Sequence, residues 1–203
     1  MRAPRRPRTR DDDGFSLVEV VVSMAVLSVL LIVFVQAVRI MTTTTTRVTA
    51  TGTGVTEARA ATDALGRQLS TATATNTPVY TGGNWYLEFS TDSVKAGDDQ
   101  QCTQWRYQPS SRLLQYRTWS TVSLVSGAWV TVADAMANDP VTQPPFAVYP
   151  SDAAFTLPRV AVDVRLLTSA GSTVQTQGQY TLRNSADAAP PSPSTVCTQL
   201  GRP

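Results

Sequence analysis

The feature that most constrains this chain is an uninterrupted apolar run close to its N-terminus. Residues 20–38 are nineteen consecutive positions without a charged side chain, and most of them are Val, Leu or Ile. As an α-helix rising about 1.5 Å per residue, the run is about 28 Å long, which matches the ~30 Å hydrocarbon core of a bilayer. So much valine disfavours a soluble helix but is tolerated in lipid. We therefore predict that residues 15–41 form a membrane-spanning helix.

The charges around this run predict its orientation. Five of the first ten residues are arginines, and basic residues that flank a span stay on the cytoplasmic side. Residues 42–203 are therefore expected to be extracytoplasmic, which makes the chain a single-pass membrane protein. The alternative is a secretory signal peptide, whose apolar stretch of about 7–15 residues precedes a small-residue cleavage site. Here the run is longer, and residues 39–42 (RIMT) offer no such site.

The composition excludes several classes of function. Of 17 basic and 15 acidic side chains, five and three lie in residues 1–14, so the remainder carries twelve of each and no basic stripe for nucleic acid. The chain has no histidine, one lysine (Lys95) and no Gly-rich phosphate loop, so no nucleophile with a base beside it is visible. Two cysteines are too few for a zinc site. We predict no enzymatic activity, no cofactor and no metal, and no specific nucleic-acid binding.

One residue at the start of the apolar segment does not fit a plain anchor. Glu19 is surrounded in sequence by Leu and Val, and no basic side chain occurs between Phe15 and Val38. An acid within a span is costly, on the order of 2–3 kcal/mol at the centre and less near the end. Such a residue usually has a positively charged partner, which this segment does not supply.

Residues 14–19 (GFSLVE) resemble the cleavage and methylation signature of type IV prepilins and type II secretion pseudopilins, and the apolar helix behind them extends the resemblance. The resemblance implies that residues 1–14 are a cytoplasmic leader. A prepilin peptidase/N-methyltransferase would cut between Gly14 and Phe15 and then methylate the new N-terminus at Phe15. Glu19 would become the fifth residue of the mature chain.

Cleavage would create the cation that Glu19 needs, the α-amine of Phe15. Because the two groups are one helical turn apart and a helix N-terminus favours a carboxylate, the pair could form within one chain. It could also form between neighbouring subunits and set the axial register of a filament, which is the version that the family resemblance implies. The sequence leaves both arrangements open.

Two features depart from the family pattern. Asp11–Asp13 directly precede Gly14, where family leaders more often place Lys or Arg, and we expect an effect on peptidase efficiency rather than on orientation. The span contains neither Gly nor Pro, whereas major pilins often carry a helix breaker there. This favours a minor position over that of a major pilin.

Residues 42–76 are expected to continue the helix in amphipathic form. An apolar stripe recurs at intervals of mostly three, four or seven residues; it comprises Val48, Val55, Ala58, Ala61 or Thr62, Leu65 and Leu69. Gly52, Gly54 and the threonines weaken it, and we predict helix to about residue 74, stopped by residues 76–78 (NTP). The run Thr42–Thr46 is either a weak stretch of helix or a solvated, glycosylated stalk.

Beyond residue 77 the apolar period changes to two, which predicts an antiparallel β domain over residues 77–185. Residues 85–89 alternate, and residues 101–108 with 112–119 and 159–168 with 173–183 read as two hairpins. Residues 133–158 are rich in proline and read as loops, and residues 186–203 as an irregular tail. The fold class is α+β, pilin-like, with the long helix packed on the sheet. Residues 102–119 and 179–184 also resemble the globular domain of minor pilins and J-type minor pseudopilins.

Three further groups of residues are candidate sites. If residues 42–203 are extracytoplasmic, Cys102 and Cys197 can form a disulfide that pins the tail to the sheet, the alternative being two buried free thiols. Asp92, Asp98 and Asp99 lack the spacing of a calcium loop and read as a solvated turn. Several aromatic residues could stack on a sugar or peptide but read more simply as core and cross-strand pairs; they are Trp105, Tyr107, Tyr116, Trp119 and Trp129.

These observations predict a prepilin-like structural subunit, a minor pilin or pseudopilin of a pilus, secretion or DNA-uptake machine. Its expected partners are the lipid bilayer, the prepilin peptidase/N-methyltransferase and other pilin or pseudopilin subunits. The expected location is the membrane and, after assembly, a surface filament. Two alternatives remain: a surface adhesin or binding module that uses a pilin-type anchor, and a signal-anchored domain that never assembles.

Overall fold

The computed structural model describes residues 16–92, 100–123, 125–185 and 196–197. The predicted leader, the cleavage positions Gly14 and Phe15, and most of the tail lie outside these residues, as do Lys95, Asp98 and Asp99. The chain divides into two compact units, Met1–Thr46 and Arg47–Pro203, which are described separately below.

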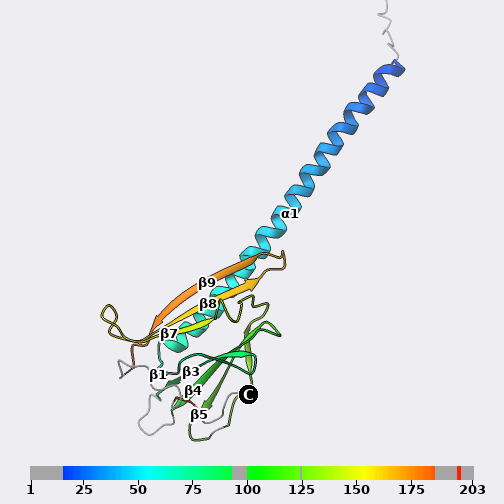
Figure 1. The fold of residues 1–203 in the computed structure, drawn as a ribbon. Coiled ribbons are helices and arrows are strands. Elements are labelled where there is room, and N and C mark those ends of the chain that lie inside the picture. The colour runs from blue at the N-terminus through cyan, green and yellow to red at the C-terminus, as the bar shows by residue number, and fades with distance from the viewer. Residues whose placement is uncertain (1–15, 93–99, 124, 186–195, 198–203) are drawn as a thin grey trace, which may run out of the picture. The chain divides into compact units, whose positions relative to one another are not determined.

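One helix, α1 (Leu17–Leu69), runs without interruption from the first unit into the second (Figure 1). The threonine run lies within it: Thr45 donates its hydroxyl to the Met41 carbonyl at 2.8 Å and Thr46 to the Thr42 carbonyl at 2.9 Å. These bonds satisfy the hydroxyl groups on the helix itself, at a small cost in helix stability. The run is therefore a stretch of helix, as one of the two sequence interpretations has it.

The helix ends five residues earlier than the sequence predicts. After Leu69 the chain makes a tighter turn, in which the Ala72 amide donates to the Leu69 carbonyl, and the Thr73 amide then donates to Ser90 at 2.8 Å. Strand β1 (Ala74–Thr75) pairs directly with Ser90 and Phe89. Sheet pairing by this β-branched segment therefore takes over before residues 76–78 can act as a helix stop.

The second unit contains two antiparallel sheets (Figure 1). In the first, which we call sheet A, the order is β1-β3-β4-β5-β6, with β2 also paired to β3. Its remaining strands are β2 (Val79–Thr81), β3 (Asn84–Thr91), β4 (Gln101–Gln108), β5 (Leu113–Ser120) and β6 (Val130–Ala133). Sheet B has the order β7-β8-β9 and consists of β7 (Phe146–Tyr149), β8 (Arg159–Leu167) and β9 (Thr173–Thr181).

Both predicted hairpins are confirmed, as β4–β5 and β8–β9. The interpretation of residues 133–158 as loops was incomplete, because this stretch holds the end of β6 and all of β7. Proline can flank such short strands without removing a ladder hydrogen bond. The four residues of β7 pair with β8 from Phe146↔Val162 to Tyr149↔Arg159.

The core lies between residues 54–69 of α1 and the two sheets. Ala58, Ala61, Leu65 and Leu69 are fully buried and share one hydrophobic cluster with side chains from β3, β4, β5, β7, β8 and β9. A fully buried Leu contributes about 1.5–3 kcal/mol relative to an exposed one, so this stripe is what fixes the helix to the sheets. The α+β class predicted from the sequence is confirmed.

Two hydrogen bonds and one glycine refine this packing. The indole nitrogen of Trp105 donates to the Gln68 side-chain carbonyl at 2.7 Å, and the Tyr180 hydroxyl donates to the Thr62 carbonyl at 3.0 Å. Gly66 is buried against the Tyr180 ring: a Cβ at this position would lie only 2.5 Å from Cζ of that ring. A glycine is required here because helix and aromatic ring approach too closely for any side chain.

Candidate functional site

The exposed N-terminal part of α1 is the first candidate site. Ser16 precedes the helix, and its carbonyl accepts the Glu19 and Val20 amides at 2.9 and 3.2 Å. Serine is a favoured residue at this capping position. Glu19 follows three residues later, the Ser-x-x-Glu order of a capping box, which the sequence analysis did not weigh. Glu19 therefore lies where a carboxylate also favours the helix N-terminus.

No hydrogen bond or ion pair joins the Glu19 carboxylate to another of the described residues; its two predicted neighbours in the processing site, Gly14 and Phe15, lie outside them. The carboxylate is exposed on the helix surface. The structure therefore presents Glu19 as an exposed carboxylate at the first turn of α1.

The aliphatic side chains of this part of the helix are exposed all around. Large apolar residues from Leu17 to Met41 are 40–80% exposed, and α1 is the one helix among the described residues that is long and apolar enough to cross a membrane. Monomeric soluble proteins rarely leave a continuous apolar surface of this size in water. The few polar groups are satisfied locally, as Ser28 shows by donating to the Met24 carbonyl at 2.7 Å, so the segment suits an apolar environment.

A segment that is apolar and exposed from Leu17 to Met41 fits a membrane anchor. A family model described as the prokaryotic N-terminal methylation motif matches residues 9–35. The motif is characteristic of type IV pilins and pseudopilins, and the N-terminal segment of this chain is therefore similar to that of prepilin-type subunits. Comparisons with curated proteins and with solved structures gave no match.

The second unit contains the disulfide between Cys102 and Cys197. Both cysteines are buried, in a small cluster with Trp119 and Val196. The Val196 carbonyl accepts a hydrogen bond from the Asn76 side-chain amide at 2.5 Å. Residues 196–197 are therefore held against the face of sheet A that is turned away from the helix, by one covalent and one polar contact.

The same face of sheet A carries a buried polar network that the sequence analysis missed. Glu88 accepts hydrogen bonds from Asn76 at 2.9 Å and Gln104 at 2.7 Å, and Gln104 accepts one from Arg117 at 2.8 Å. Burial, followed by the charge of Arg106, lowers the pKa of Arg117. The sequence offered one sign of this network: Glu, Gln and Arg occur at every second position of these strands. Such a pattern predicts a solvent-exposed face unless other residues are known to pack over it.

The aromatic residues considered for ligand stacking are used inside the protein. Trp105, Tyr107 and Trp119 are buried, and Tyr116 stacks on Trp105 with 5.2 Å between ring centroids. The guanidinium of Arg106 lies 3.8 Å from the ring centroid of Trp129, and that of Arg117 lies 4.7 Å from it. The simpler interpretation, core and cross-strand pairs, is confirmed for Trp105, Tyr107, Tyr116 and Trp119. Trp129 is half-buried, lies just before β6 and packs on the two guanidinium groups instead.

The candidate calcium loop is only partly described. Of its three aspartates, Asp92 is described, and its carboxylate accepts hydrogen bonds from Thr73 and Gln100 at 3.3 and 3.4 Å. Among the described residues, no group of three or more His, Cys, Asp or Glu side chains could hold a metal ion.

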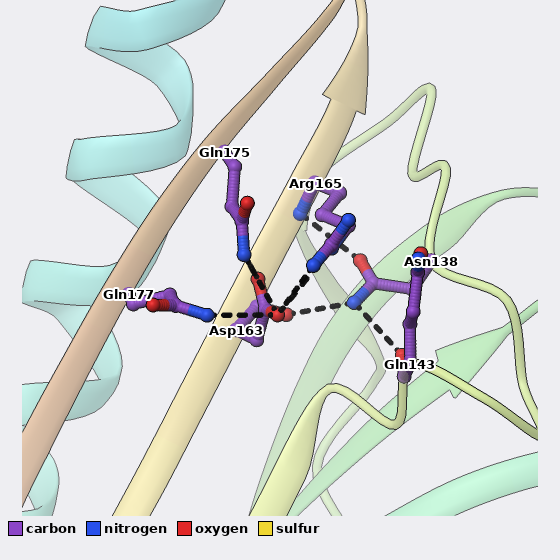
Figure 2. A network of polar contacts seen from close by, with 6 residues as sticks. All are labelled: Asn138, Gln143, Asp163, Arg165, Gln175 and Gln177. Carbon is purple, nitrogen blue, oxygen red and sulfur yellow. Dashed lines mark hydrogen bonds and ion pairs between the residues drawn. The ribbon is translucent and has the colours of Figure 1, made fainter.

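Sheet B presents a second polar surface, on the face opposite the core. Asp163 is its centre: Arg165 donates to the carboxylate at 3.2 and 3.3 Å, Gln175 at 3.0 Å and Gln177 at 3.2 Å (Figure 2). Asn138, from the segment before β7, donates to the Asp163 carbonyl at 2.9 Å. The network holds the side chains of two strands in fixed positions on one face.

Proposed function

We propose that this chain is a minor pilin or pseudopilin, processed between Gly14 and Phe15 and assembled into a filament through α1. The single observation that carries the proposal is the methylation motif at residues 9–35, which overlaps the exposed apolar part of the helix, residues 17–41. The leader of residues 1–14 would remain cytoplasmic until the prepilin peptidase/N-methyltransferase removes it and methylates Phe15. The domain of residues 77–185 would stand on the extracytoplasmic side.

In this proposal Glu19 selects the position of each subunit. An ion pair between this carboxylate and the α-amine of Phe15 in a neighbouring subunit would be surrounded by aliphatic side chains. Charges attract more strongly in such an environment than in water, and a carboxylate left alone there is penalised. A subunit that docks out of register would leave both charges unpaired.

The minor position is supported by the sequence of the span. Described residues 17–41 form helix throughout and contain no helix breaker. Beyond the helix the chain forms a domain with its own hydrophobic core, a disulfide and a buried polar network. The machine that uses the subunit could be a pilus, a type II secretion system or a DNA-uptake apparatus.

The processing step is tested by isolating the full chain from membranes that contain a prepilin peptidase and measuring its N-terminus by mass spectrometry. The expected product begins with N-methylated Phe15. A chain that still begins at Met1 in the presence of active peptidase would contradict the proposal, as would cleavage at another position.

The assembly role is tested by Glu19→Gln, which keeps the size of the side chain and removes its charge. We expect processed protein that remains in the membrane and enters filaments at a small fraction of the wild-type level. Glu57→Gln is the matched control, because Glu57 is an exposed acid farther along the same helix. Equal incorporation of the two variants would refute the role given to Glu19.

A further inference from the structure

A groove of about 660 Å³ lies on the outer face of sheet B, lined by residues of β7, β8, β9 and Pro144. Its volume falls within the ~300–1,000 Å³ typical of small-molecule sites. It is separate from the N-terminal helix, and no part of the proposed assembly function uses it. The strand register explains why the surface is hollow there.

Three cross-strand rows build the groove. In the middle row Ala147 pairs with Ala161, which pairs with Gln179, so two alanines form the floor. One flanking row pairs Tyr149 with Arg159. Because side chains on one face of neighbouring strands stand in line, small residues between two rows of large ones leave a trough across the sheet.

The opposite wall is formed by Asp163 and Gln177, which are paired across β8 and β9. The Asp163 carboxylate is already bonded to Arg165, Gln175 and Gln177, as Figure 2 shows. Its charge is therefore balanced within the protein, and the amide groups beside it are held in place. This wall offers oriented polar groups without a free charge.

The wall at Tyr149 is also fixed and also balanced. Arg159 forms an ion pair with Asp152 at 2.7 Å, and its guanidinium lies 3.6 Å from the ring centroid of Phe155 and 5.8 Å from that of Tyr149. The Arg159 side chain is 12% exposed, and its buried Nε has no hydrogen-bond partner among the described residues. Tyr149 itself is 46% exposed, which leaves ring surface available to a ligand.

We propose that this groove binds a neutral saccharide. Both charged walls are neutralised internally, so an ionic ligand would find no opposite charge. A sugar ring presents hydroxyl groups that both donate and accept, as the Gln177 and Gln179 amides require, and an apolar face of C–H groups that can lie on the Tyr149 ring and the alanine floor. The inference goes beyond the proposed function, since an anchored subunit could assemble with or without it.

The test uses the full chain in phosphatidylcholine nanodiscs, because detergents with sugar headgroups would compete. Saturation-transfer-difference NMR would be recorded with maltotetraose, cellotetraose and tetra-N-acetylchitotetraose. A tetragalacturonate and an uncharged Ala/Ser tetrapeptide serve as the acidic and peptide probes. We expect at least one neutral oligosaccharide to bind with a dissociation constant of about 1 mM or tighter, and more strongly than the acidic saccharide or the peptide.

Two variants locate the binding. Ala161→Leu fills the floor, and Tyr149→Ala removes the ring; each is expected to weaken binding about tenfold or more. The matched controls are Thr173→Leu, which adds bulk to the same face of β9 away from the groove, and Tyr80→Ala, since Tyr80 is 45% exposed on sheet A. The controls should bind as wild type, and a far-ultraviolet circular dichroism spectrum unchanged in all four variants shows that each is folded.

Three results would overturn the proposal. These are no binding of any neutral probe, tighter binding of the acidic saccharide or the peptide, and binding that Ala161→Leu and Tyr149→Ala leave unchanged. None of them bears on processing at Gly14 or on filament assembly, which are measured separately.

Discussion

The packing of Gly66 against Tyr180 predicts that one substitution has opposite effects at two glycines of the same helix. Replacing Gly by Ala inside a helix stabilises it by up to about 1 kcal/mol, because alanine loses less backbone freedom. At Gly52 a Cβ would meet nothing within 4 Å. Gly52→Ala should therefore raise the free energy of unfolding by up to about 1 kcal/mol.

At Gly66 the same gain is opposed by the aromatic ring. A Cβ there would lie 2.5 Å from Cζ of Tyr180 and 2.9 Å from its hydroxyl oxygen, and nearer still to Cε1. The Tyr180 ring has little room to move away from Gly66, because its other edge packs on Gly178, where a Cβ would lie 2.9 Å from Cε2. Moving it also breaks the hydrogen bond to the Thr62 carbonyl.

Overpacking of this kind costs about 1–3 kcal/mol, and a lost hydrogen bond about 1 kcal/mol. The higher helix propensity of alanine offsets up to about 1 kcal/mol of these two costs. Gly66→Ala should therefore lower the free energy of unfolding by about 1–3 kcal/mol. All four tryptophans lie in residues 85–129, so their fluorescence during urea unfolding reports on the unit of residues 47–203 alone.

A double-mutant cycle isolates the cause. In a Tyr180→Ala background the obstacle is absent, so Gly66→Ala should become neutral or stabilising, as it is at Gly52. The coupling between positions 66 and 180 should then be at least about 1 kcal/mol, well above the ~0.3–0.5 kcal/mol scatter of independent sites. A destabilisation by Gly66→Ala that persists unchanged without the Tyr180 ring would refute this explanation.

Three further outcomes are expected. Cys102→Ser/Cys197→Ser should lower the free energy of unfolding by up to about 4–5 kcal/mol, the chain-entropy value for a loop of this size; urea unfolding measures it, and wild-type protein with its disulfide reduced should match the variant. Burial raises the pKa of Tyr107 above 10.0, so the unfolded state loses its proton first and stability should fall as the pH rises above 10.0; Tyr107→Phe should flatten that fall. Hydrogen bonds from its own turn lower the pKa of Asp139 below 3.8, so stability should decline as the pH drops below 3.8, and less so in Asp139→Asn.

Local sequence signals predicted the long helix and the two hairpins, but not every residue at which they begin or end. The hairpins follow from alternating strands on either side of short turns, such as residues 109–111 (PSS), and β4–β5 pairs in full register around that turn. The helix end was placed too late because Thr73–Thr75 carry no local stop signal. What ends α1 there is pairing with β3, a partner some fifteen residues away whose position only the fold supplies.

The candidate sites also differ in whether local sequence predicts them. The N-terminal helix was predictable because its evidence, the apolar run and Glu19, lies in one short segment. The groove was not, because its floor needs Ala147 and Ala161 to meet across β7 and β8. The sequence around an alanine in a strand does not indicate which residue will pair with it on the neighbouring strand. The buried network around Glu88 was hidden for a related reason, since Asn76, which donates to Glu88, also donates to the carbonyl of the distant Val196.

The link between Cys102 and Cys197 has a consequence for a chain pulled by its two ends. The cysteines are 95 positions apart in sequence, so tension passes across the sulfur bridge and bypasses the residues between them. At about 3.4 Å per residue, some 320 Å of contour length cannot be drawn out while the bridge is intact. Strands β5 to β9 all lie inside that covalent loop, and so force on the termini cannot unravel them into an extended tether.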